Sequence, residues 1–133
     1  MKMESDLHFK VEVKTQLNQF PKIVGSIPGI GSWDPIYGLI LYTNEKDFPI
    51  WRSLRPIKVK SNIPIEFKIV LYENGVVKEW ESFEVDNNRI IIVNEPKMVY
   101  VGIFKNLQGT IMIDNNSLDQ KGKNQPKKSL INL

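Results

Sequence analysis

Three features of the sequence predict an all-β fold of about eight short strands, arranged as an antiparallel sandwich or barrel. Apolar and polar residues alternate in short segments that are separated by turn residues. No stretch of ten residues keeps the period of a helix. The chain of 133 residues has no alanine and is rich in isoleucine and valine, which favour strands over helices. This length suits one domain with a single core.

The N-terminal part of the chain predicts two strands followed by a loop. Every second residue from Leu7 to Val13 is apolar, which is the period of a half-buried strand. A second, shorter strand is expected over residues 22–26. Glycines and prolines are frequent between residues 28 and 35, so a loop is expected there.

The rest of the chain predicts further strands and one tight hairpin. Asn74-Gly75 lies between two alternating segments, and this dipeptide is the strongest short-range signal of a hairpin. The expected strands cover residues 38–42, 50–59 (interrupted at Pro56), 63–71, 76–81, 89–93 and 98–104, with a weaker one over 109–113.

The net charge is concentrated at the C-terminus. Residues 115–133 carry four lysines and one aspartate, which account for the whole net charge of +3. Residues 1–114 are therefore balanced, whereas a nucleic-acid binding domain usually has a basic surplus on its folded body. We predict a folded module over residues 1–114, no nucleic-acid partner, and a polar basic tail or linker over residues 115–133 that is disordered.

Several absences restrict the chemistry and the location of the protein. No apolar run approaches the roughly 18 residues of a membrane-spanning helix, so no membrane partner is expected. Glu4, Asp6 and His8 interrupt any apolar segment of a secretory signal, so the expected location is cytoplasmic. The chain has no cysteine, which removes disulfides, thiolate zinc sites and cysteine nucleophiles. No Asp/Asn/Gly calcium loop is present, so we expect neither a metal nor a cofactor.

Catalytic residues are not expected in this chain. His8 is the sole histidine and alternates outward with charged neighbours, so a Ser-His-Asp relay would depend on one surface residue. Glu79, Glu81 and Glu84 are close enough in the sequence for a glycosidase pair. Acidic residues are, however, ordinary on an exposed strand face, and we predict that the chain is not an enzyme.

The three tryptophans occur in different settings. Trp33 lies in a loop rich in glycine and proline, where bends expose side chains. Trp51 opens an apolar strand and is expected in the core. Trp80 is flanked by acidic residues on both sides, which favours exposure. An exposed indole is unfavourable unless a core neighbour, a partner or a ligand covers it.

Five short segments occur in a particular order along the chain. They are Ile23-Val24-Gly25-Ser26, Gly31-Ser32-Trp33-Asp34, Glu66-Phe67-Lys68, Glu79-Trp80-Glu81-Ser82 and Asn88-Arg89. Together they resemble the starch-binding domain, the family-20 carbohydrate-binding module, over roughly Leu7 to Phe104. The resemblance implies an antiparallel, immunoglobulin-like β-sandwich of seven to eight strands. It also implies non-catalytic binding of α-1,4-glucans such as starch, glycogen, maltooligosaccharide or cyclodextrin.

The resemblance implies carbohydrate-binding roles for Trp33, Lys68, Trp80, Glu81 and Asn88. In the family, the two tryptophans form a platform for adjacent glucose rings. The C–H face of a pyranose stacks on an aromatic ring, and two separated indoles set at an angle suit the curved α-1,4 chain. Lys68 is expected to donate to sugar hydroxyls, Glu81 to accept from them, and Asn88 to do both.

The sequence departs from the family at its second binding site. The family has a tyrosine just before the Ile-Val-Gly-Ser segment, where this chain has Pro21-Lys22, and a lysine cannot stack a glucose ring. Tyr37, Tyr42 and Phe48 lie where the family's other aromatic occurs, and we expect none of them to bind sugar. One dominant binding event per molecule is therefore predicted.

The resemblance also implies a partner. In intracellular relatives the module precedes a catalytic domain, so we interpret the polar tail as the start of a linker to such a domain, which the module would target to polysaccharide. Arg89 is expected to be structural. The alternative function is a protein–protein interaction module of immunoglobulin or fibronectin type, with Trp33 and Trp80 as hot spots of the interface.

Overall fold

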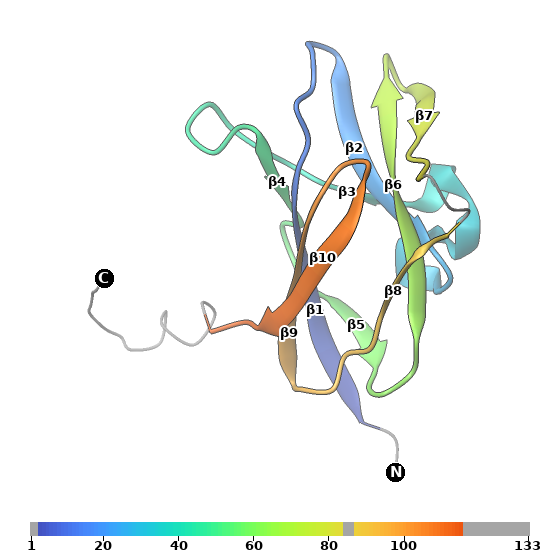
Figure 1. Cartoon of the computed structure of the whole chain (residues 1–133), viewed down its shortest axis with the longest axis vertical. Helices are drawn as coiled ribbons and strands as arrows, with labels where there is room; N and C mark the ends of the chain where they lie inside the picture. Colours follow the sequence, from blue (N-terminus) through green and yellow to red (C-terminus); the bar gives the residue numbers. More distant parts are fainter. Residues whose placement is uncertain (1–2, 84–86, 116–133) are drawn as a thin grey trace.

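Two five-stranded sheets form a β-sandwich in the computed structural model, which describes residues 3–83 and 87–115 (Figure 1). The first sheet has the order β10-β9-β1-β4, and β5 also pairs with β1. Its strands are β1 (Glu4–Glu12), β4 (Ile50–Arg52), β5 (Ile57–Lys60), β9 (Lys97–Ile103) and β10 (Asn106–Ile113).

The second sheet has the order β3-β2-β6-β7, and β8 also pairs with β6. Two short 3-10 helices, η1 and η2, lie in the connection between β2 and β3. The elements are β2 (Gln19–Gly25), η1 (Pro28–Trp33), η2 (Pro35–Tyr37), β3 (Leu39–Ile40), β6 (Ile65–Glu73), β7 (Val76–Trp80) and β8 (Arg89–Ile91).

The predicted β-sandwich is confirmed, with differences in detail. The strand pairs are antiparallel except that β1 and β9 run parallel. The described residues form ten strands, more than the seven to eight expected, in part because the segment 50–59 divides into β4 and β5. Pro56 lies between them, and proline lacks the N–H group that would continue a ladder. The hairpin at Asn74 and Gly75 is confirmed by φ values of 53° and 82°, which a two-residue hairpin turn requires.

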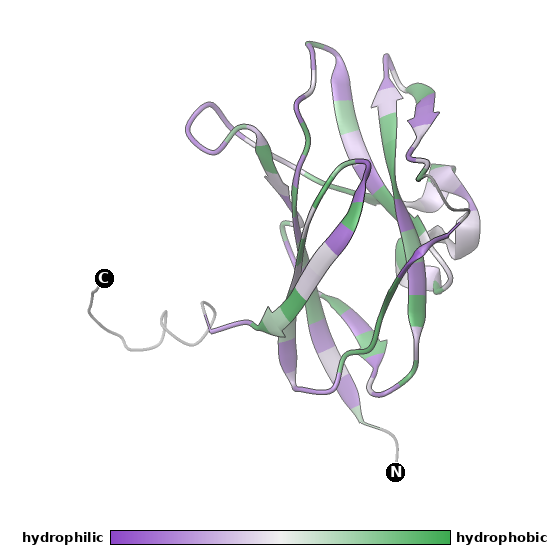
Figure 2. Ribbon diagram, in the orientation of Figure 1, coloured by the Kyte–Doolittle hydropathy of each residue, from purple (hydrophilic) through white to green (hydrophobic). Residues whose placement is uncertain are grey.

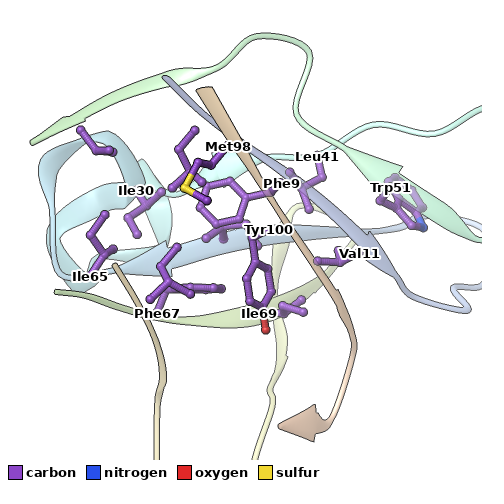
Figure 3. Packing of buried hydrophobic residues seen from close by; sticks show 14 of the residues in the cluster. Phe9, Val11, Ile30, Leu41, Trp51, Ile65, Phe67, Ile69, Met98 and Tyr100 are labelled. Atoms are coloured by element: carbon purple, nitrogen blue, oxygen red, sulfur yellow. The ribbon is translucent and has the colours of Figure 1, made fainter. Parts of the chain in front are cut away.

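The core lies between the two sheets (Figure 3). The ring of Phe67 meets Phe9 and Tyr100 edge to face, with ring centres 5.3 and 5.0 Å away. Trp51 is buried as predicted, and its Nε1 donates to the carbonyl oxygen of Val13 at 3.0 Å. Hydrophobic and hydrophilic residues alternate along the strands (Figure 2), so that each strand has an inner and an outer face.

The described residues contain neither a membrane-spanning helix nor a cluster of metal ligands. Within the described residues, no helix is long and apolar enough to cross a membrane. Residues 3–83 and 87–115 also contain no group of three or more His, Cys, Asp or Glu side chains that could hold a metal ion. The tail predicted over residues 115–133 lies outside the described residues except for Asn115, and so does Glu84. The disorder of the tail therefore stays a prediction.

Candidate functional site

One face of the second sheet turns away from the core and carries Trp80. Lys22 of β2, Val70 of β6 and Trp80 of β7 are paired across the three strands, and residues paired in this way point to the same side of a sheet. Their sequence neighbours Ile23 and Ile69 are fully buried in the core. The row from Lys22 to Trp80 therefore points outward, and we call this side of the sheet the outer face.

The connection between β2 and β3 covers part of the outer face. Ile30 in η1 inserts into the core and is fully buried. Gly38 lies so close to Val24 that a Cβ atom on the glycine would be 2.8 Å from a methyl carbon of the valine. Val24 and Val70 are fully buried although they point outward, and they form a small apolar cluster with Tyr72 and the partly buried Phe20.

Trp33 ends η1 in a strained turn of this connection. Its φ is 69°, in the left-handed region, and Gly31 and Ser32 before it have φ values of 89° and 47°. A bulky residue rarely adopts this conformation, which costs roughly 1–3 kcal/mol and is found mainly at functional sites. The strained turn presents an indole that is 38% exposed.

Lys22 fastens η2 to the outer face. Its Nζ donates to the carbonyl oxygens of Pro35 and Ile36 at 2.8 and 3.3 Å, and it lies 4.2 Å from the centre of the Tyr72 ring. Asp34 caps η2, because its Oδ1 accepts from the backbone N–H of Ile36 at 3.0 Å. Burial lowers the pKa of Lys22, and the carboxylate of Asp34 opposes this effect in part. The segment that follows η1 is thus held by both a side chain and a cap.

Trp80 points to the outer face, and Trp33 belongs to the loop that is fastened to this face. Trp80 is two strands away from Lys22, about 10 Å at the usual strand spacing. Lys22 in turn holds Pro35, which comes two residues after Trp33. The indoles are exposed to almost the same extent, 38% for Trp33 and 37% for Trp80. In Figure 1, η1 and η2 (cyan) lie on the side of the molecule where β7 ends.

Lys68 also lies on this face, beside Trp80. It comes two residues before Val70, the partner of Trp80, so its side chain is a diagonal neighbour of the indole. Its Nζ donates to the carbonyl oxygens of Glu81 and Asn87 at 3.3 and 3.1 Å. A lysine ammonium has three N–H donors, and these two acceptors among the described residues account for two of them.

Asn88 is half-buried and comes just before β8. Its Nδ2 donates to Oε1 of Glu66 at 2.9 Å. The next residue, Arg89, is buried, as expected of a structural residue, and it pairs with Phe67 of the core. Alternation along the strand therefore points Asn88 toward the outer face, with its amide oxygen as an acceptor.

Glu81 lies in the interior, which corrects the expectation that it accepts hydrogen bonds from sugar hydroxyls. The residue is 1% exposed, and its two carboxylate oxygens accept from the guanidinium of Arg89. Successive residues of a strand point to opposite faces, so an outward Trp80 requires an inward Glu81. Adjacent residues of a strand cannot both direct their side chains to one ligand, and this geometry would have separated the two residues.

Lys22, which lies where the resemblance places the family's second site, fastens a loop in this structure. Lys22 is 6% exposed and holds η2, so it offers no stacking surface. Tyr37, Tyr42 and Phe48 are exposed to 71%, 44% and 44%, and their expected lack of sugar binding stays a prediction. The role of Lys22 as an anchor of the loop could not be predicted from the sequence, because no local pattern marks a contact across 13 residues.

A comparison with protein families identifies the chain. The model of the family described as "Starch binding domain" (CBM_20) matches residues 4–101. The chain belongs to this family. Over 62 residues it is 34% identical to an alpha-amylase of Thermomonospora curvata, a match that covers 47% of this chain and 10% of the relative. This starch-binding domain thus spans about a tenth of the length of that relative.

Solved structures share the fold of this starch-binding domain. The family 15 glucoamylase from Hypocrea jecorina superposes with a TM-score of 0.67 at 21% identity, covering 77% of this chain and 17% of that one. The family 20 module of the maltotetraose-forming amylase from Pseudomonas saccharophila STB07 superposes with a TM-score of 0.59 at 20% identity, covering 74% of this chain and 99% of that one. Starch-binding domains are non-catalytic, so this chain is a carbohydrate-binding module for starch and not an enzyme.

Proposed function

We propose that this module binds single α-1,4-glucan chains by stacking adjacent glucose rings on Trp33 and Trp80. The observation that carries the proposal is a pair of indoles, each more than one third exposed, one on the outer face of β7 and one in the loop that Lys22 fastens to the same face. Exposed indoles are unfavourable in water, and the C–H face of a pyranose is the kind of apolar surface that covers them. Indoles carried by separate elements can be set at an angle, which suits the curvature of an α-1,4 chain.

The polar residues beside the indoles supply the specific contacts. Lys68 donates its remaining N–H to a sugar hydroxyl, and the amide oxygen of Asn88 accepts from one. Both side chains are already hydrogen bonded to the protein, so little freedom is lost when the sugar binds. The loop that carries Trp33 is also held in place, by the hydrogen bonds from Lys22 to the residues that follow it.

The role of this binding is to bring an enzyme to its polysaccharide. The relative named above is an alpha-amylase and one structural neighbour is a glucoamylase, and the matching part covers only 10% and 17% of these chains. We propose that this module targets an attached or associated enzyme to starch, glycogen or maltooligosaccharide. Its own contribution is a raised local concentration of the polysaccharide.

Co-sedimentation tests the proposal directly. The protein should pellet with granular starch and be released by soluble β-cyclodextrin, and it should stay in solution with cellulose of the same mass. Soluble glycogen should compete as β-cyclodextrin does. Equal retention on cellulose, whose β-1,4 chains are flat, or failure of β-cyclodextrin to release the protein would refute stacking of a curved α-glucan.

A further inference from the structure

A fully buried ion pair lies directly behind the proposed glucan site. Nε and Nη2 of Arg89 donate to Oε2 and Oε1 of Glu81, each at 2.8 Å, and the side chains are 1% and 0% exposed. Two parallel hydrogen bonds of this kind fix the planes of both groups relative to each other. Burial disfavours the charge on Arg89, but the hydrogen bond and the charge of Glu81 outweigh it, so that the pKa of Arg89 lies above its usual value.

Hydrogen bonds from the protein occupy the carboxylate of Glu81. Besides Arg89, its Oε2 accepts from the backbone N–H of Ile69 at 2.8 Å, and its Oε1 accepts from the backbone N–H of Lys105 at 3.0 Å. A carboxylate with four protein donors and 1% exposure of the residue is not an acceptor for an external hydroxyl.

The pair joins the two sheets of the sandwich. Ile69 belongs to β6 in the second sheet, whereas Lys105 lies between β9 and β10 in the first. On the other side of the pair, Arg89 donates to the hydroxyl of Tyr100 and to the carbonyl oxygen of Ile103, each at 2.8 Å. Glu81 and Arg89 therefore tie the end of β7 and the start of β8 to the opposite sheet.

The same two residues are connected to the binding side chains. Trp80 precedes Glu81 at the end of β7, an edge strand that pairs only with β6 among the described strands. The backbone carbonyl of Glu81 accepts from Nζ of Lys68, and Asn88 precedes Arg89. A displacement of the ion pair therefore shifts the indole, the amine and the amide together.

We propose that Glu81 and Arg89 are positioning residues, which hold Trp80 and Lys68 in the geometry that an α-glucan needs without touching the sugar. This inference rests on the proposed function. If it is correct, a substitution of Arg89, which has no access to the ligand, weakens glucan binding as much as a substitution of Glu81. A direct contact between Glu81 and a sugar would give Glu81 an effect that Arg89 does not share.

A double-mutant cycle on binding tests the assignment. Glu81→Gln, Arg89→Gln and the double variant are titrated with β-cyclodextrin by calorimetry. We expect each single variant to bind at least tenfold more weakly, and the double variant to bind no more weakly than the worse single one, because both changes break the same unit. A folded Arg89→Gln variant with wild-type affinity, or additive losses in the double variant, would overturn the proposal. If Arg89→Gln does not fold, Arg89→Lys, which keeps the charge but loses the fork, takes its place.

Two surface pairs offer matched controls. Glu79→Gln makes the same chemical change two residues earlier, in an exposed pair with Lys105. Arg52→Gln does so for an arginine that pairs with Asp47 at the surface. Both should bind β-cyclodextrin like the wild type, since surface pairs contribute little.

A readout without sugar separates this inference from the proposed function. In a Trp33→Phe background, Trp80 is the exposed indole and Trp51 is buried, so acrylamide quenching reports on Trp80. We expect Glu81→Gln and Arg89→Gln to change the quenching constant equally, whereas Glu79→Gln should leave it unchanged. Unchanged quenching in the two buried-pair variants would refute positioning, even if the wild type binds β-cyclodextrin. Absence of β-cyclodextrin binding by the wild type would refute the proposed function alone.

Discussion

Nζ of Lys22 lies 2.8 Å from the carbonyl oxygen of Pro35, and this contact holds η2 against the outer face of β2. The lysine occupies the position where the family carries an aromatic residue of its second site. In this chain its apolar stem packs on the sheet while its amine satisfies two carbonyl groups of a loop. The lysine thereby stabilises the loop that carries Trp33.

Removal of either exposed indole should abolish most of the affinity. Trp33→Ala and Trp80→Ala each lose a large stacking surface, which is worth roughly 2–4 kcal/mol for a central residue of a binding site, or at least about 30-fold in Kd. Titration with β-cyclodextrin by calorimetry measures the loss. Tyr42→Ala removes another aromatic ring of similar exposure, 44%, and should leave Kd unchanged. Wild-type affinity in both tryptophan variants would contradict the proposed platform.

A side chain at Gly31 should damage the loop and the binding together. Gly31 has φ 89°, and a Cβ atom there would lie 2.9 Å from backbone atoms of Tyr37 and Gly38. Gly31→Ala should lower the free energy of unfolding by roughly 2 kcal/mol or more and weaken binding of β-cyclodextrin. Gly75→Ala is the matched control, because φ is 82° but nothing lies within 4 Å. It should cost only about 1 kcal/mol and bind normally. Chemical denaturation measures the free energy of unfolding of both variants. Equal losses in Gly31→Ala and Gly75→Ala would contradict the close approach of the backbone at Gly31.

Lys22 should make the stability of the protein depend on pH in the alkaline range. Burial lowers its pKa from the usual 10.5, with partial opposition from Asp34. Between the lowered folded-state pKa and 10.5, the unfolded chain binds the extra proton, so this group raises the free energy of unfolding as pH rises. In Lys22→Met this contribution is absent. The stability of the wild type relative to the variant should therefore increase with pH, in urea melts kept below pH 10.

The protein should have a single glucan-binding site. Lys22 is buried at that position, so we expect calorimetry with β-cyclodextrin to give one binding event per molecule. A second event would be traced to Tyr37 or Phe48, which are the exposed aromatics of this region besides Tyr42. Such a second event would contradict the single-site expectation, and its disappearance in Tyr37→Ala or Phe48→Ala would show which residue binds.

Much of the fold follows from local patterns. Alternation from Leu7 to Val13 and from Ile65 to Leu71 predicts strands that the structure contains as β1 and β6. Asn74-Gly75 predicts the turn between β6 and β7 because few dipeptides accept positive φ at both positions. The parallel pairing of β1 with β9 is not visible in the sequence, since it joins residues about 90 positions apart.

The candidate site was predictable only in part. A loop rich in glycine exposes Trp33, and acidic neighbours favour exposure of Trp80, so both indoles could be found from the sequence. Because successive strand residues point to opposite faces, an outward Trp80 implies an inward Glu81, but the partner Arg89 is eight residues away across a loop. Acidic side chains are usually exposed, and only the tertiary structure reveals a partner that makes burial tolerable.

Taken alone, the order of residues determined the strands, the hairpin and the two tryptophans, because these depend on contacts between near neighbours along the chain. Tertiary structure alone decided that Lys22 anchors a loop and that Glu81 is buried beneath the site. Both outcomes depend on desolvation, and whether a charged group loses its water is settled by elements that meet only when the two sheets pack together.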